Sequence, residues 1–152
     1  MNHSLQIIRT DPFDASFKTL VEELDAELSI RDGDDHAFYH QFNGLDKIKH
    51  AIVAYKNNIP VACGAIKEFD RDTMEIKRMF VPSQHRRNGY ALHILNALQA
   101  WSKELGYNRC ILETGTAQPE AIALYHKAQF ELITNYGQYE GIENSICFGK
   151  KI

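Results

Sequence analysis

The chain has 152 residues, of which 44% are hydrophobic and 24% charged, and its formal net charge at pH 7 is -3. This size and apolar content predict a single domain over residues 1–152, able to fold without disulfides or metal. The slightly acidic balance argues against nucleic-acid binding, which needs a basic face. Neither a signal peptide nor an apolar run near the roughly 18 residues of a membrane span is present. We therefore expect a cytoplasmic protein that binds no membrane.

Three cysteines, Cys63, Cys110 and Cys147, lie singly in apolar segments without a CxxC pair. An odd number without close spacing indicates neither a disulfide framework nor a zinc site. The sequence therefore predicts buried free thiols.

The N-terminal part predicts a strand followed by an amphipathic helix. Residues 5–9 are the strand candidate, and Asp11 and Pro12 are typical of a helix start, as cap and first-turn residue. Apolar side chains then recur at steps of three and four, which predicts a face that packs on a sheet. They are Phe13, Phe17, Leu20, Val21, Leu24 and Leu28. Residues 31–43 are polar and aromatic, and predict an irregular loop.

The middle of the chain predicts an antiparallel meander. Its strands are residues 50–55, 60–68 and 73–81, separated by polar turns at 56–58 and 70–72. Simple alternation along the third strand places Glu75, Lys77 and Met79 on one face and Ile76, Arg78 and Phe80 on the other.

The second half alternates helices and strands. A helix is predicted from near Gly89 to Gly106, and a second over residues 119–128 with Pro119 in its first turn. Strands are predicted at residues 109–113, 130–133 and 145–150. Because a helix separates residues 73–81 from 109–113, these two strands must run parallel. The predicted class is α+β (mixed α/β), with a mostly antiparallel sheet of six to seven strands flanked by helices.

The segment that carries most chemical information is the turn VPSQHRRNGYA, residues 81–91. Backbone N–H groups at a helix start lack intrahelical partners and lie at the positive end of the helix dipole. Gly89 and Ala91 let an anion approach the backbone, and Arg86 and Arg87 add positive charge. The pattern predicts a diphosphate site, with a solvated basic loop as the alternative. Neither GxxxxGK[ST] nor GxGxxG occurs.

Arg86-x-x-Gly89-x-Ala91 resembles the R/Q-x-x-G-x-G/A signature of the GNAT N-acetyltransferase superfamily, and element order extends the resemblance over nearly the whole chain. The resemblance implies acetyl-CoA as co-substrate, with its pyrophosphate held by this turn. It also implies a parallel pair 73–81 / 109–113 that splays apart to admit the thioester. The implied binding residues are Met79, Phe80 and Val81 for the pantetheine arm, and Arg86, Arg87, Asn88, Gly89, Tyr90 and Ala91 for the pyrophosphate. Asn88 departs from the glycine or lysine often found there.

Acyl transfer to an amine needs a base, since a lysine-like ammonium has a pKa of about 10.4. Glu75 has a spacing to the turn similar to that of the catalytic glutamate in the histone-acetyltransferase branch, and is the first candidate. Glu113, at the end of the next parallel strand, is the second. A structural carboxylate paired with a neighbouring lysine or arginine is the alternative for Glu75.

Tyr125 is the candidate acid for the leaving thiolate. It lies in ALYHKAQF, which resembles the family's (A)xxxYxxxGF segment, although Ala128-Gln129-Phe130 replaces the usual glycine-phenylalanine turn. The alternative interpretation is that Tyr125 is an aromatic residue of the hydrophobic core, placed there by its helical spacing.

Two loops are candidate walls of the acceptor site: the aromatic residues Phe38, Tyr39 and Phe42, and the glycine-containing loop 136–141. His36 and His40 lack a compact third ligand, so no metal is expected.

The predicted function is transfer of an acetyl group from acetyl-CoA to a primary amine of a small molecule or peptide, by direct attack. The alternative is a non-catalytic acyl-CoA-binding sensor of the same fold. A homodimer through the last strands or an exposed helix face is left open.

Overall fold

The computed structural model describes residues 4–33 and 48–152. In this part of the chain seven strands form one sheet, in the order β1-β2-β3-β4-β5-β7-β6. Only β4 and β5 pair in parallel. The strands are β1 (Gln6–Thr10), β2 (His50–Lys56), β3 (Ile59–Asp70), β4 (Thr73–Phe80), β5 (Arg109–Gly115), β6 (Glu131–Ile133) and β7 (Ser145–Lys151). The predicted class, element order and parallel pair are confirmed.

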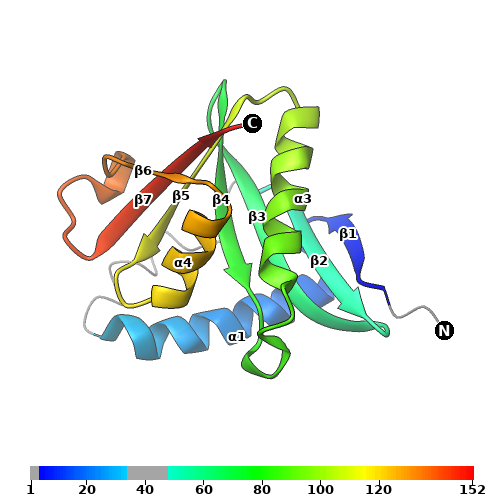
Figure 1. The fold of residues 1–152 in the computed structure, drawn as a ribbon. Helices are drawn as coiled ribbons and strands as arrows, with labels where there is room; N and C mark the ends of the chain where they lie inside the picture. Colours follow the sequence, from blue (N-terminus) through cyan, green and yellow to red (C-terminus); the bar gives the residue numbers. More distant parts are fainter. Residues whose placement is uncertain (1–3, 34–47) are drawn as a thin grey trace.

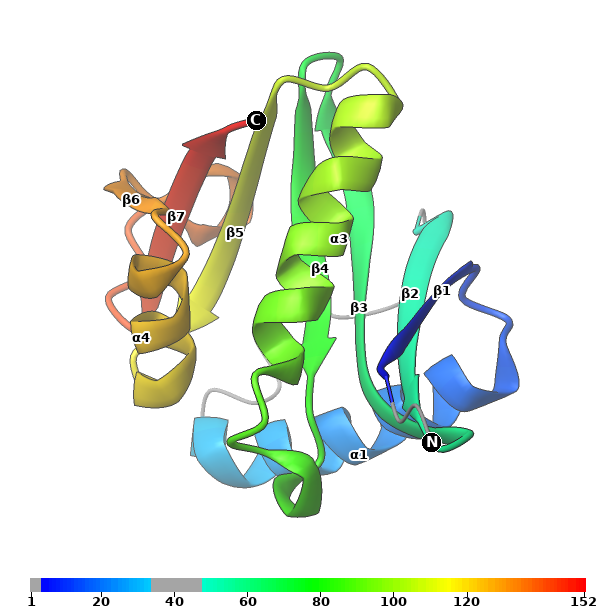
Figure 2. The ribbon, with the colours of Figure 1, turned by 45° about the vertical axis from the view of Figure 1, so that its right-hand side comes forward.

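Three α-helices of the described residues cover the two faces of this sheet: α1 (Ala15–Asp32) on one side, and α3 (Tyr90–Glu104) and α4 (Pro119–Lys127) on the other (Figures 1 and 2). None of them combines the length and the apolar character that crossing a bilayer requires.

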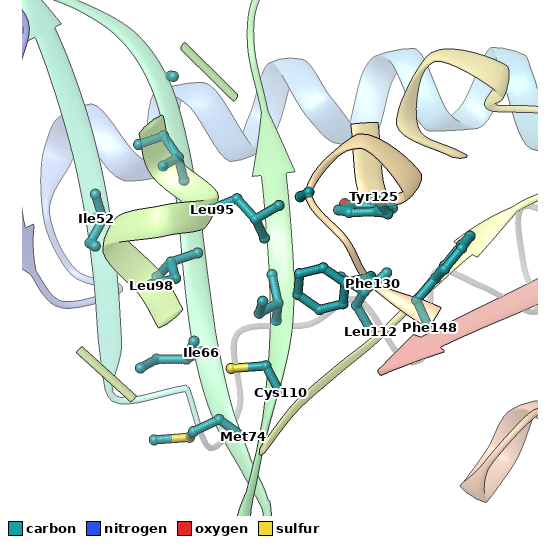
Figure 3. Packing of buried hydrophobic residues seen from close by; sticks show 14 of the residues in the cluster. Ile52, Ile66, Met74, Leu95, Leu98, Cys110, Leu112, Tyr125, Phe130 and Phe148 are labelled. Atoms are coloured by element: carbon teal, nitrogen blue, oxygen red, sulfur yellow. The ribbon is translucent and has the colours of Figure 1, made fainter. Parts of the chain in front are cut away.

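The main hydrophobic core lies between the sheet and helices α3 and α4. Leu95 and Leu98 of α3 pack over the strands beside Ile66, while Tyr125 of α4 packs near Phe130 (Figure 3). A second cluster joins α1 to the opposite face of β2, β3 and β4. The three cysteines are buried free thiols in the structure, as predicted.

Helix α1 begins at Ala15, later than Asp11 and Pro12 predicted. The Asp11 carboxylate accepts a hydrogen bond from the Phe13 amide at 2.8 Å, which stabilises a turn ahead of the helix. Asp14 is the actual cap, since its carboxylate accepts from the Phe17 amide at 2.9 Å. Phe13 therefore lies outside the helix and is 82% exposed, so its predicted place on the buried face is wrong.

A β-bulge in β4 overturns the predicted alternation of its side chains. Lys77 pairs with Ala65 and Phe80 with Cys63, so two residues of β4 lie opposite one residue of β3. Arg78 is the bulged residue, with a positive φ of 58°.

The bulge redistributes the side chains that follow it. Met79 packs with the core under α3, on the side of Ile76. Arg78 instead pairs with Asp25 of α1, and Phe80 joins the α1 cluster. The predicted alternation therefore holds only as far as Lys77.

The parallel strands β4 and β5 diverge soon after they meet. Their pairing runs from Thr73 with Arg109 to Glu75 with Ile111, although β4 continues to Phe80 and β5 to Gly115. The gap between the two strands widens toward their carboxyl ends (Figure 2). From Ile76 to Phe80, β4 therefore keeps β3 on one side while β5 has moved away from the other.

Candidate active site

A cavity of about 580 Å³ opens where β4 and β5 diverge. Its walls come from α1, β4, the turn after β4, the start of α3, the end of β5, and α4. The cavity brings together most of the predicted site residues: Glu75, Met79, Phe80, Val81, Arg86, Arg87, Gly89, Ala91, Glu113 and Tyr125. Asn88 and Tyr90 lie outside its lining. The Asn88 amide instead donates to the carbonyl oxygens of His85 and Arg86, and Tyr90 packs against the main core.

The turn after β4 leads directly into α3. A short 3-10 segment, η2 (Ser83–His85), follows the strand, and Gly89 is the N-cap of α3 with φ 78°. This left-handed conformation is strained for a residue with a Cβ, so the backbone favours glycine here. Arg87 also has a positive φ, of 69°. The start of α3 thus presents its free N–H groups beside Arg86 and Arg87 at one end of the cavity.

The Arg86 guanidinium is already engaged by protein groups. Its Nε donates to the Val81 carbonyl oxygen at 2.8 Å, and its Nη2 lies 2.7 and 2.9 Å from the two carboxylate oxygens of Glu27 on α1. Glu27 also faces Arg31 one turn later, at 3.8 Å, and Arg31 pairs with Glu120 in the first turn of α4. These charges line the cavity and link the basic turn to α1 and α4.

The α1 residues were missed as site residues by the sequence interpretation, which gave this helix only a packing role. Leu24 and Leu28 line the cavity as well as packing on the sheet, and Glu27 and Arg31 flank them. The i,i+4 spacing of Glu27 and Arg31 beside the apolar stripe was the available signal.

Glu75 lies at the last residue where β4 and β5 pair, and is 5% exposed. Its Oε2 accepts a hydrogen bond from the Tyr136 hydroxyl at 2.6 Å, and the Lys77 Nζ lies 3.9 Å from the same oxygen. Burial lowers the pKa of Lys77, against the opposing effect of the Glu75 charge. Glu75 is thus a buried carboxylate that lines the cavity and has two partners at its Oε2 atom.

Two buried tyrosines also line the cavity. Tyr125 is 5% exposed and packs against Phe130 and Phe148, with ring centroids 6.1 and 5.7 Å away. Burial raises the pKa of Tyr125, and the charge of Glu113 raises it further. Tyr139, in the predicted wall loop, is 2% exposed, and burial raises its pKa too. Both phenols therefore keep their protons at neutral pH.

Of the two loops predicted to wall the acceptor site, one can be placed. Tyr139 lines the cavity, whereas Tyr136 reaches Glu75. Phe38, Tyr39 and Phe42, like His36 and His40, lie outside the described residues. Within residues 4–33 and 48–152, no three histidine, cysteine or acidic side chains gather into a metal site.

A family model described as the acetyltransferase (GNAT) family matches residues 17–130, and the chain belongs to this family. The uncharacterized N-acetyltransferase YsnE of Bacillus subtilis is 30% identical over 115 residues, 72% of this chain and 76% of its own length. A crystal structure assigned to the acyl-CoA N-acyltransferases, from Klebsiella pneumoniae, has 26% identity and a TM-score of 0.82, with 99% of each chain covered. A GNAT acetyltransferase from Elizabethkingia anophelis with acetyl-CoA bound has 18% identity and a TM-score of 0.72, covering 99% of this chain and 100% of its own. The resemblance carried by Arg86-x-x-Gly89-x-Ala91 is thereby confirmed at the level of the family.

Proposed function

We propose that the protein transfers the acetyl group of acetyl-CoA to a primary amine of a small molecule or peptide. The observation that carries the proposal is the single cavity shared by the basic turn, the buried carboxylate of Glu75 and the buried phenol of Tyr125. Membership of the GNAT acetyltransferases and the acetyl-CoA bound to the Elizabethkingia protein support the choice of donor.

The residues present suit the two halves of the donor. Free N–H groups at the start of α3, together with Arg86 and Arg87, suit the pyrophosphate. The part of β4 from which β5 has diverged suits the pantetheine arm, whose amides would pair with the backbone of residues 79–81. The gap between the strands then receives the thioester.

The reaction uses one base and one acid. A protonated amine near pH 7 must first lose a proton, at a cost of about 4–5 kcal/mol, and Glu75 accepts it. The amine nitrogen attacks the thioester carbonyl carbon, so that a C–N bond forms and the carbonyl oxygen becomes an oxyanion. When the oxyanion collapses, the C–S bond breaks and Tyr125 donates its proton to the departing thiolate. The nitrogen, now bonded to the acetyl carbon, loses its second proton, which returns through solvent to the Tyr125 phenolate, and the proton held by Glu75 is released to solvent. The products are the acetylated amine and the free thiol of CoA.

A screen of small amines and peptides tests this function. The protein is incubated with acetyl-CoA and each acceptor, and both free CoA thiol and the gain of one acetyl group are measured, the latter by mass spectrometry. Acceptor-dependent thiol release with a matching product supports the proposal. Tight binding of acetyl-CoA without release on any acceptor would support a non-catalytic sensor instead.

The Glu27–Arg86 ion pair predicts that donor binding competes with an internal carboxylate. Glu27→Gln removes the competing charge, and we expect it to tighten acetyl-CoA binding about two- to fivefold, the range that partly exposed ion pairs allow. Titration calorimetry at low ionic strength measures the effect. Glu22→Gln is the matched control, since it removes the same charge from an exposed position on the same helix. Weaker binding in Glu27→Gln would mean that Glu27 instead holds Arg86 in its binding orientation.

A further inference from the structure

Tyr136 makes a contact that its own loop does not require. It follows β6, at the outer edge of the sheet, yet its hydroxyl reaches Glu75 on β4, 61 residues earlier in the chain. Strands β5 and β7 lie between β4 and β6 in the sheet order, so this contact joins the loop after β6 to a strand that is not its neighbour in the sheet. The loop is held separately by the Asn135 side chain, which donates to the carbonyl oxygens of Ile142 and Ser145 at 3.0 Å each.

The ring of Tyr136 is fixed by two edge-to-face contacts. Its centroid lies 5.2 Å from that of Phe69 on β3 and 5.7 Å from that of Tyr139. Such pairs contribute packing energy and restrict ring orientation. Tyr139 lines the cavity, while Tyr136 stands behind Glu75 and outside the lining. Its hydroxyl therefore reaches the cavity through the Glu75 carboxylate, which does line it.

Two groups converge on one oxygen of the carboxylate. The Tyr136 hydroxyl lies 2.6 Å from Oε2 of Glu75, and the ammonium group of Lys77 lies 3.9 Å from the same atom. Burial, followed by the charge of Glu75, raises the pKa of Tyr136, so the phenol keeps its proton and remains a donor.

We propose that Tyr136 is a positioning residue for the base: it fixes Oε2 of Glu75, so that Oε1 is the oxygen that takes the proton of the acceptor amine. This inference rests on the proposed function, because it needs Glu75 to be the base. The hydrogen bond restricts the orientation of a carboxylate that lines the cavity, and a small misplacement of this group would slow proton transfer.

A double-mutant cycle between Tyr136→Phe and Glu75→Gln tests the inference. Tyr136→Phe keeps the ring contacts and removes only the hydroxyl. We expect kcat to fall about tenfold with the KM for acetyl-CoA unchanged, because Tyr136 lies outside the lining of the cavity that is proposed to hold the donor. In the Glu75→Gln background, Tyr136→Phe should cause no further loss, since the group it positions is already gone. Thermal melting of each variant checks that the fold is retained.

The matched control is Tyr107→Phe. Tyr107 also donates a hydrogen bond to a glutamate, Glu68, but this pair lies on the exposed surface and outside the cavity lining. The kcat of Tyr107→Phe should equal that of the wild type.

The outcomes separate the two proposals. A loss in Glu75→Gln combined with full activity in Tyr136→Phe would overturn only the positioning role. Equal losses from Tyr136→Phe in both backgrounds would also overturn it, because Tyr136 would then act independently of Glu75. If Glu75→Gln keeps wild-type activity, Glu75 is not the base, and the positioning role of Tyr136 is then wrong as well.

Discussion

Glu75→Gln is expected to lower kcat about 10²–10³-fold at pH 7, within the range that general-base catalysis contributes. Glutamine matches glutamate in size and can still accept the Tyr136 hydrogen bond, but it cannot take up the proton of the amine. The buried position of Glu75, only 5% exposed, leaves bulk water poorly placed to replace it. Steady-state thiol release, with the acceptor found in the screen, measures the loss.

The loss of activity in Glu75→Gln should become smaller as the pH rises. As pH rises toward the ammonium pKa of about 10.4, a growing fraction of the acceptor is already neutral and needs no base. The ratio of wild-type to Glu75→Gln rates should therefore shrink with increasing pH. A constant ratio would show that Glu75 affects something other than deprotonation of the acceptor. Glu113→Gln is the comparison variant: a larger loss there would transfer the role of base to Glu113, which also lines the cavity.

Local features of the site could be predicted from the sequence because short-range physics determines them. The strand, basic turn and helix start around Gly89 are determined by residues within about ten positions of one another. Glycine also adopts a positive φ more readily than other residues do, as Gly89 does here. The same holds for the two-residue turn Asn57–Asn58, where both residues adopt positive φ.

The bulge at Arg78 could not be predicted in the same way. Alternation assumes that each residue of β4 lies opposite one residue of β3. The residues of β4 alone do not determine the register between the two strands. The opposing residue is Gly64, whose missing Cβ would lie only 2.7 Å from Cγ2 of Ile94 and 2.8 Å from Cδ1 of Leu98. Helix α3 therefore lies directly over the bulge, and this packing is visible only after the whole sheet has formed.

The two contacts that most refine the site join distant parts of the chain. Tyr136 and Glu75 are 61 residues apart, and Arg86 and Glu27 are 59 apart. No period or motif relates such pairs, because their meeting depends on the sheet order and on where α1 crosses the sheet. The sequence identified Glu75, Arg86 and the loop 136–141 as candidates, whereas their contact partners became evident only from the fold.

Tyr125→Phe is expected to lower kcat about 10–100-fold, less than Glu75→Gln, because a thiol has a pKa of only about 8.5 and its thiolate can depart with little help from an acid. Phenylalanine keeps the contacts of Tyr125 with Phe130 and Phe148, so the free energy of unfolding should hardly change. Steady-state kinetics give kcat, and a thermal melt of the same preparation checks the fold.

The raised pKa of Tyr125 sets the pH range over which the effect should persist. Burial, assisted by the charge of Glu113, shifts this pKa upward from the usual value near 10. The phenol therefore remains protonated below about pH 10, and the ratio of wild-type to Tyr125→Phe rates should stay constant from about pH 7 to pH 9.5. Unchanged kcat in Tyr125→Phe would leave Tyr125 as a core aromatic. Tyr139→Phe would then be the informative variant, because Tyr139 is the other buried phenol that lines the described cavity.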